Sequence, residues 1–125
     1  MTSVEIFKQW LAAINGHDVS ALTALMAADH VFVDSLGNRV DGARSIEAGW
    51  RGYFATCPDY WIREDCSMAE GERMLVAGEA GGTIDGQSWR TPAAWKVVIR
   101  DGRVVEWHVF ADNKPVYEIL RRRRP

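Results

Sequence analysis

The strongest constraint on the fold is a change of hydrophobic periodicity near Tyr60. From that residue on, apolar and polar residues alternate, and pairs of an acid with glycine interrupt the alternation: Glu70-Gly71, Asp85-Gly86 and Asp101-Gly102. Alternation is typical of a strand with one buried face, and Asp-Gly is a strong signal for a tight hairpin turn. The second half of the chain is therefore predicted to form consecutive antiparallel strands over residues 60–69, 73–84, 88–100 and 103–111.

The first half of the chain has the periodicity of helices instead. A helix that ends at Asn15-Gly16 carries apolar residues at i, i+3, i+4 and i+7, which are Phe7, Trp10, Leu11 and Ile14. Asp18 can cap a second helix, which is predicted to end near residue 28. A third helix has an apolar face that consists of Ile46, Trp50, Tyr53, Phe54 and Cys57.

Between the second and third helices, residues 30–34 form a predicted strand that ends in Asp34, and residues 35–38 form its turn. Helices that precede a long antiparallel sheet define an α+β fold. We predict a cone-shaped, curled, mainly antiparallel sheet whose pocket is enclosed by the three helices. The whole chain, residues 1–125, is expected to be this one domain, with a last helical turn over residues 116–120.

Composition and charge exclude several functions. The net charge is −2, so no general basic surface indicates nucleic-acid binding. Residues 121–124 are four arginines, which we expect to be a solvated chain end. No apolar stretch is long enough to span a bilayer, and no signal peptide is evident. We therefore expect a cytoplasmic protein that binds neither membrane nor nucleic acid.

Histidines and cysteines do not indicate a metal site or a disulfide. His17, His30 and His108 are scattered without the spacing of metal ligands, so no metal is expected. His17 and His30 flank predicted turns and should be exposed. Cys57 and Cys66 are predicted to be buried free thiols.

Alternation also sorts the strand residues between an inner and an outer face. Trp95 and its alternate neighbours share one face of the third long strand, and Trp107 and Val109 share one face of the last. His108 and Phe110 then lie on the opposite, outer face. Because Phe110 and Val98 would leave that face partly apolar, a homodimer formed through it is expected.

Three segments of the chain, with the order of its predicted elements, resemble a known family. They are residues 10–18, residues 27–34 with Leu36-Gly37, and residues 101–113. The chain resembles the nuclear transport factor 2-like superfold, which includes SnoaL-like polyketide cyclases and ketosteroid isomerases. The resemblance covers nearly the whole chain and supports the predicted cone.

The resemblance implies a small, apolar, cyclic ligand and places Asp34 where ketosteroid isomerases have their catalytic base. Trp10 stands at the position of their first-helix tyrosine, and Ala94 or Trp95 at that of their oxyanion-hole aspartate. Tyr53, or the indole N–H of Trp10 or Trp95, would then hydrogen-bond a carbonyl of the ligand. The residues expected to bind the ligand are Trp10, Ile14, Phe32, Trp50, Tyr53, Phe54, Trp95, Trp107 and Val109.

Two functions stay open at this point. The first is cofactor-free proton transfer next to a carbonyl, with Asp34 as the base and its pKa raised by desolvation among tryptophans. The second is a non-catalytic ligand-binding or protein-interaction module, in which Asp34 accepts hydrogen bonds from the backbone of the following turn. Neither function calls for a cofactor.

Overall fold

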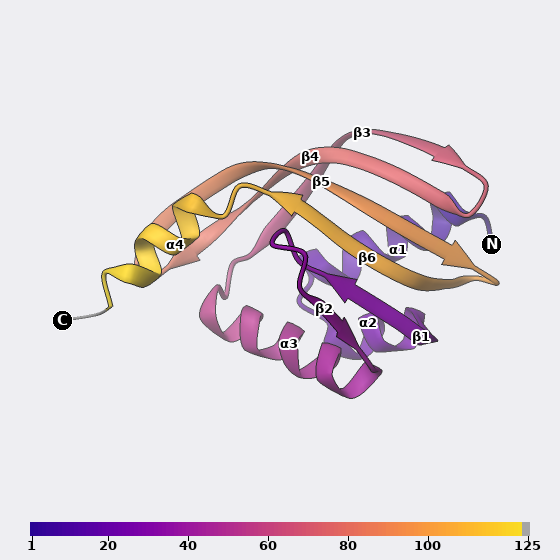
Figure 1. Ribbon diagram of the computed structural model, residues 1–125, viewed down its shortest axis with the longest axis horizontal. Helices are drawn as coiled ribbons and strands as arrows, with labels where there is room; N and C mark the ends of the chain where they lie inside the picture. The colour runs from indigo at the N-terminus through magenta and orange to yellow at the C-terminus, as the bar shows by residue number, and fades with distance from the viewer. Residues whose placement is uncertain (124–125) are drawn as a thin grey trace.

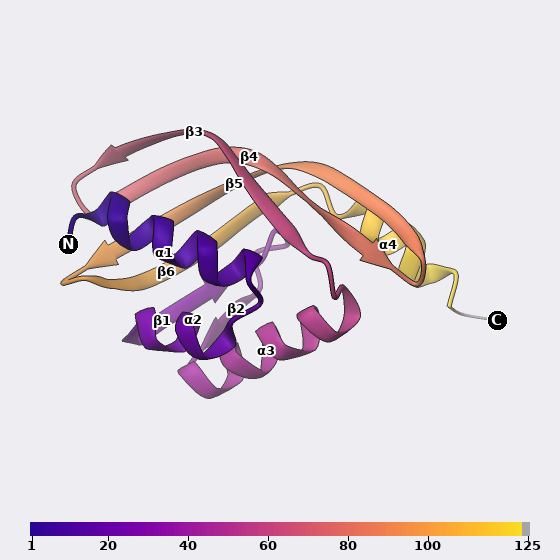
Figure 2. The same ribbon diagram turned by 180° about the vertical axis from the view of Figure 1, so that it is seen from behind.

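The computed structural model describes residues 1–123 and has the predicted α+β architecture (Figures 1 and 2). All the strands belong to one curled sheet in the order β2-β1-β6-β5-β4-β3, and α1, α2 and α3 cover one of its faces. Strands β1 and β6 pair in parallel, and every other pair is antiparallel. The elements are α1 (Ser3–Asn15), α2 (Val19–Leu25), β1 (Met26–Val33), β2 (Arg39–Asp41), α3 (Ala43–Thr56), β3 (Trp61–Glu70), β4 (Arg73–Ile84), β5 (Gln87–Arg100), β6 (Arg103–Ala111) and α4 (Lys114–Arg121).

The hairpin turns have the geometry that their sequences demand. Asp85 and Gly86 both have positive φ angles, 52° and 76°, and so do Asp101 and Gly102, with 53° and 74°. Two successive residues with positive φ make the type I′ turn, whose twist matches that of the flanking strands. The predicted bounds of β4 and β6 are confirmed, whereas β3 is displaced by one residue at both ends and β5 begins one residue earlier than predicted.

Close backbone contact explains the glycines of β4. A Cβ atom on Gly78 would lie 1.7 Å from the carbonyl oxygen of Arg63, and one on Gly81 would lie 2.5 Å from the ring of Trp61. The register of β3 against β4 shifts between Glu64 and Cys66, which marks a bulge in β3. Absent side chains on β4 therefore let β3 approach and cross it as the sheet curls.

Two predictions about the first half of the chain are wrong in detail. Helix α2 ends at Leu25, and β1 begins at Met26, because Met26 pairs with Val104 of β6. The short strand β2 (Arg39–Asp41) was not predicted as a strand, and it pairs with the end of β1. Both differences come from strand pairing, of β1 with the distant β6 and of β2 with the neighbouring end of β1, which overrides local helix or loop preference.

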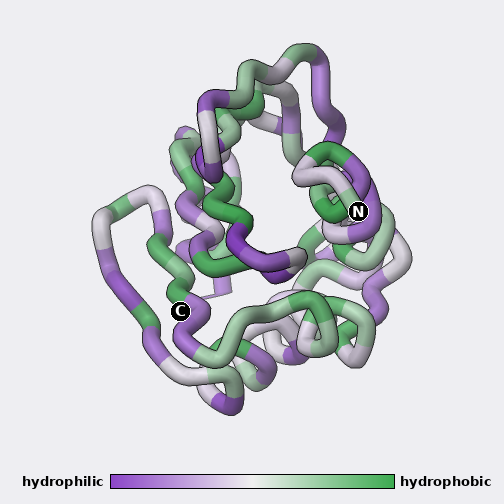
Figure 3. Tube along the Cα trace, turned by 90° about the vertical axis from the view of Figure 1, so that its right-hand side faces the viewer, coloured by the Kyte–Doolittle hydropathy of each residue, from purple (hydrophilic) through white to green (hydrophobic). Residues whose placement is uncertain are grey.

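The core joins the helices to the concave face of the sheet. Trp10 of α1 is fully buried, and its ring centroid lies 6.4 Å from that of Trp50 in α3 and 5.9 Å from that of Trp107 in β6. Along the strands, hydrophobic and hydrophilic residues alternate, as the colours of Figure 3 show. On β5 the buried positions are Trp89, Thr91, Ala93, Trp95, Val97 and Ile99, as the alternation predicts.

The histidines differ from the prediction. His17 is half-buried, with its ring stacked on Phe54 at 4.3 Å. His30 was expected to be exposed, but it is only 1% exposed, because it lies within β1 and not beside a turn. Its Nδ1 donates to the carbonyl oxygen of Val104 over 2.7 Å. Burial lowers the pKa of His30, although the Val104 carbonyl and the charges of Asp29 and Glu106 act in the opposite direction.

The two cysteines differ in burial. Cys57 is buried and free, as predicted, whereas Cys66 is free but exposed. Cys66 directly follows the register shift in β3, where it pairs with Ala77 on the outer face of the sheet. The bulge reverses the alternation and turns this side chain away from the core.

The lowered pKa of the buried His30 predicts that the folded protein loses stability in acid. Because its pKa is lowered in the folded state, the unfolded chain binds more protons below the ordinary value of 6.5, and stability falls as the pH drops through that value. Titration of this one group can change the free energy of unfolding by at most about 1.4 kcal/mol per pH unit. His30→Asn keeps a donor for Val104 but does not titrate. Urea unfolding from about pH 7 to about pH 5 should show a flatter profile for this variant. If the free energy of unfolding of this variant fell with pH as steeply as that of the native protein, the pH dependence would not come from His30.

Candidate functional site

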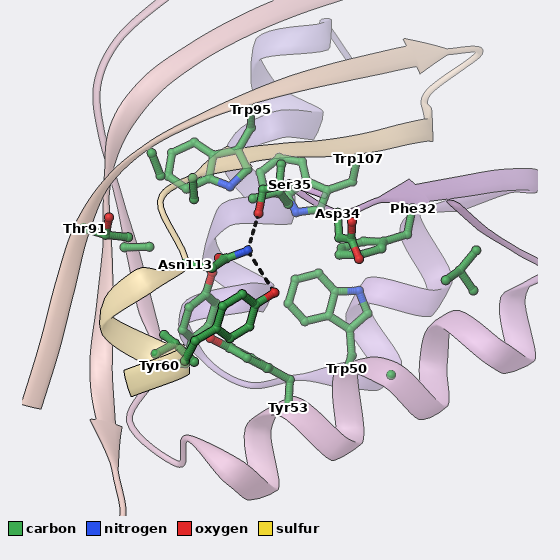
Figure 4. Close-up of a pocket in the computed structure, with 18 of the residues that line it drawn as sticks. Phe32, Asp34, Ser35, Trp50, Tyr53, Tyr60, Thr91, Trp95, Trp107 and Asn113 are labelled. Carbon is green, nitrogen blue, oxygen red and sulfur yellow. Dashed lines mark hydrogen bonds between the residues drawn. The ribbon is translucent and has the colours of Figure 1, made fainter. Parts of the chain in front are cut away.

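A cavity of about 390 Å³ lies between α3 and the concave face of the sheet, and α4 closes one end of it. Its wall is predominantly apolar. Figure 4 shows side chains from the end of β1, from α3 and from β5 and β6 around this space. The lining residues are Phe32, Asp34, Ser35, Val40, Ser45, Ile46, Gly49, Trp50, Tyr53, Tyr60, Ala80, Trp89, Thr91, Ala93, Trp95, Trp107, Val109, Ala111, Asn113, Val116, Tyr117 and Leu120.

Local periodicity explains how the wall forms. Alternate residues of β5 and β6 face the helices, which brings Trp95 and Trp107 together, stacked with centroids 5.7 Å apart. On α3, Trp50 and Tyr53 are three residues apart and therefore lie on one face. Small residues at Ala93 and elsewhere on the sheet leave room between these rings, and the space is the cavity.

The structure divides the nine residues expected to bind a ligand into two groups. Phe32, Trp50, Tyr53, Trp95, Trp107 and Val109 line the cavity. Trp10, Ile14 and Phe54 are buried behind its wall, in the packing between the helices and the sheet. Trp10 therefore cannot donate a hydrogen bond to a molecule in the cavity. Whether the other six bind a ligand stays a prediction.

The tryptophan side chains of the wall expose mainly ring carbon atoms to the cavity. The Nε1 atoms of Trp50 and Trp95 are buried and have no hydrogen-bond partner among residues 1–123. A molecule in the cavity would therefore meet the rings of these tryptophans more than their N–H groups. The expected carbonyl contact from Trp95 would need its ring to turn.

Tyr53 and Tyr60 are phenols at one side of the cavity, and Tyr60 was not predicted to belong to the site. Their rings meet edge to face at 4.8 Å, and burial raises the pKa of both above the ordinary value of 10. They are therefore neutral at physiological pH. Neither hydroxyl hydrogen-bonds to another group in the part of the chain that the structure describes.

Asp34 lies where β1 ends and forms a turn, as the second of the two interpretations predicts. Its Oδ1 accepts from the backbone N–H groups of Leu36 and Asn38, each over 2.9 Å, and its Oδ2 accepts from Nδ2 of Asn38 over 3.1 Å. The carboxylate is half-buried and also lines the cavity. One side chain thus holds the turn and faces the pocket (Figure 4).

The predicted rise in the pKa of Asp34 is wrong. Partial burial acts to raise the pKa, but the hydrogen bonds from Asn38, Leu36 and Gly37 outweigh it, and the pKa lies below the ordinary value of 3.8. Donors that favour the charged form have this effect on a carboxylate. Asp34 is therefore ionised at neutral pH.

A polar contact joins the Asp34 turn to the C-terminal helix. Nδ2 of Asn113 donates to Oγ of Ser35 over 2.6 Å and, more weakly, to the hydroxyl of Tyr117 over 3.5 Å. Figure 4 shows this group between the turn after β1 and α4. The wall residues of α4, which are Val116, Tyr117 and Leu120, were not predicted.

The arginines after α4 hold it against the sheet. Arg123 forms an ion pair with Asp85 in the β4–β5 turn, with Nη2 and Oδ1 2.8 Å apart, and Arg122 contacts Gln87. The Arg123 guanidinium lowers the pKa of Asp85. Both side chains are exposed, as expected for a solvated chain end, but they also contact the β4–β5 turn, and Arg124 lies outside the described residues.

Residues 1–123 contain no group of three or more His, Cys, Asp or Glu side chains placed to hold a metal ion. Within the same residues, no helix has the length and apolar character needed to cross a bilayer.

The sequence matches the model of the SnoaL-like domain family over residues 7–107. The chain therefore belongs to the SnoaL-like domain family, as the resemblance predicted. No protein of curated function matches the sequence.

Solved structures with the same fold include several from bacteria. A hypothetical protein with a ketosteroid isomerase-like fold from Catenulispora acidiphila, in complex with trimethylamine, has a TM-score of 0.83 and 24% identity, over 92% of this chain and 91% of that one. A putative SnoaL-like polyketide cyclase from Jannaschia sp. has a TM-score of 0.83 and 20% identity, over 92% and 88%. An LEH-like epoxide hydrolase from M. tuberculosis has a TM-score of 0.81 and 18% identity, over 96% and 90%. These identities establish the fold.

Proposed function

We propose that the protein binds a small, largely apolar, cyclic molecule in the cavity between α3 and the sheet. The observation that carries this proposal is the cavity itself, because a space of about 390 Å³ with an aromatic wall is within the size range of ligand sites. A core of this size that served only to stabilise the fold would be expected to fill such a space, since voids weaken packing. The Catenulispora acidiphila protein with this fold is in complex with a small molecule, which is consistent with the proposal.

Proton transfer next to a carbonyl is the second candidate function, and the position of Asp34 favours it. Its carboxylate lines the cavity and is ionised, so it can accept a proton. Its low pKa makes it a weak base, however, and three hydrogen bonds already engage it. Binding without catalysis is therefore the function that the geometry supports better.

The outer face of the sheet supports a homodimer as part of the proposal. Phe110 on β6 is 48% exposed and Leu75 on β4 is 60% exposed, and both point away from the helices. Met68 of β3 pairs with Leu75 and extends the same apolar surface. A second copy of the chain covering this face would remove these side chains from water.

Ligand binding can be tested by filling the cavity. Ala93 lines it from β5, and Ala93→Leu places three further carbon atoms inside it. In a thermal-shift panel of steroids, aromatic polyketides and terpenoids, we expect a binder of the native protein to lose its effect on this variant. A ligand at a hundred times its Kd stabilises by about 2.7 kcal/mol. Ala48→Leu, on the exposed side of α3, is the control and should keep binding. Retained binding by both variants would place the ligand elsewhere.

The role of Asp34 as a base is tested by Asp34→Asn. For a ring ketone found in the panel, deuterium exchange next to the carbonyl should fall by roughly 100-fold or more if Asp34 is the base, with Kd preserved. Because the pKa of Asp34 is lowered, the rate should stay constant from neutral pH down to about its ordinary pKa of 3.8. Equal exchange rates in both proteins would leave binding as the whole function.

The dimer is tested by Phe110→Lys, which places a charge on the apolar outer face. We expect the native protein to sediment as a dimer and this variant as a monomer, because a buried unpaired charge opposes association. Leu36→Lys is the control, since Leu36 is 66% exposed in the turn after β1, away from that face. A native monomer at micromolar concentration would contradict the proposal.

A further inference from the structure

The cavity wall is unusually rich in aromatic rings. Eight of the lining side chains are aromatic: Phe32, Trp50, Tyr53, Tyr60, Trp89, Trp95, Trp107 and Tyr117. The face of each ring carries partial negative charge, and tryptophan gives the strongest attraction for a cation placed over it. An aromatic wall of this kind accommodates an apolar molecule, and it also stabilises a positively charged one.

The formal charge of the wall has one sign. Asp34 is the charged side chain among the described lining residues, and no lysine, arginine or histidine lines the cavity with it. Its hydrogen bonds keep the carboxylate ionised at neutral pH. The turn donates twice to Oδ1 and once, from Nδ2 of Asn38, to Oδ2, so Oδ2 is the less engaged oxygen and is the one available to a ligand. An anionic ligand would meet this charge with no cation to balance it.

The charge and the rings lie together at one end of the cavity. Asp34 follows Phe32 by two residues, so both side chains are on the same face of the chain at the end of β1. The ring of Phe32 meets that of Trp50 edge to face, with centroids 6.3 Å apart. Figure 4 shows Asp34, Phe32 and Trp50 grouped on one side of the cavity, with Tyr60 and Thr91 on the other.

We propose that the bound molecule carries an alkylated ammonium group, which sits between the Asp34 carboxylate and the rings of Phe32 and Trp50. This inference rests on the proposed ligand-binding function and names the chemical class of the ligand. An alkylated ammonium ion suits the site because it is weakly hydrated, lies well against ring faces and is attracted by the carboxylate. A site with a fixed negative charge and no cation selects against carboxylates and phosphates.

The opposite end of the cavity fixes the orientation of such a molecule. Burial raises the pKa of Tyr53 and Tyr60, which shows that charge is disfavoured there. The apolar body of the ligand would therefore lie toward Tyr60 and Trp89, while the charged head stays near the turn and the solvent. Ser35 and Asn113 at the mouth are neutral and would not oppose the charge.

A pair of matched probes separates charge from shape. Phenyltrimethylammonium and tert-butylbenzene differ at one atom, a charged nitrogen in place of a carbon, and have nearly the same size. We expect the cation to bind the native protein about tenfold more tightly or better, measured by NMR titration. In Asp34→Asn the advantage should shrink by roughly fivefold, because the carboxylate is partly solvated and its attraction is moderate. Asparagine keeps the Oδ1 acceptor, so the turn should remain folded.

Asp41→Asn is the matched control for charge. It removes a carboxylate from β2, near the end of β1 but outside the cavity, and should leave the preference for the cation unchanged. Equal loss in both variants would show a general electrostatic effect and overturn the assignment to Asp34. Equal or tighter binding of tert-butylbenzene to the native protein would overturn the ammonium inference and leave the proposed function standing. If neither probe nor any member of the neutral panel binds, both proposals fail.

Discussion

The packing of Trp10 is the contact on which the rest of the structure depends. Its buried ring lies against His30 of β1, Trp50 of α3 and Trp107 of β6, so one side chain from α1 joins the helical layer to the sheet. Two of these partners also line the cavity, and Trp10 supports them from behind. A ligand that contacts Trp50 or Trp107 would therefore press against the core itself. The wall is rigid for the same reason, because close-packed interiors do not yield easily.

Much of this arrangement could be predicted from the sequence, because its signals are local. Alternation and Asp-Gly turns located β4 and β6 correctly, and helical periodicity located α1 and α3. Strand β2 was missed although it pairs with the nearby end of β1, because its three residues are too short for an alternation signal. The early start of β1 and the burial of His30 were missed because each depends on contact with β6, far along the chain. The part of α4 in the wall was missed for the same reason. Nothing within residues 116–120 indicates that Asn113 and Arg123 will hold the helix across the cavity.

Asp34 shows how a correct position can accompany a wrong chemical expectation. The resemblance to ketosteroid isomerases suggested an inward acid, and the carboxylate does line the cavity. The turn residues after it supply backbone donors, which the sequence indicated as the alternative role of Asp34. These donors lower its pKa, whereas desolvation by the tryptophans was expected to raise it. The balance between the two effects depends on hydrogen-bond geometry, which becomes visible only in the folded structure.

That balance also bears on what the site is suited to do. A base gains from a pKa near the working pH, because it must both accept and release a proton. An acid held permanently ionised by its own turn is better suited to attract a positive charge than to exchange protons. The aromatic wall acts in the same direction, since ring faces stabilise cations, while the neutral phenols of Tyr53 and Tyr60 favour an apolar body. The charge of Asp34 at one end of the cavity and the low polarity around Tyr53 and Tyr60 at the other therefore suit the same ligand, one with a charged head and an apolar ring.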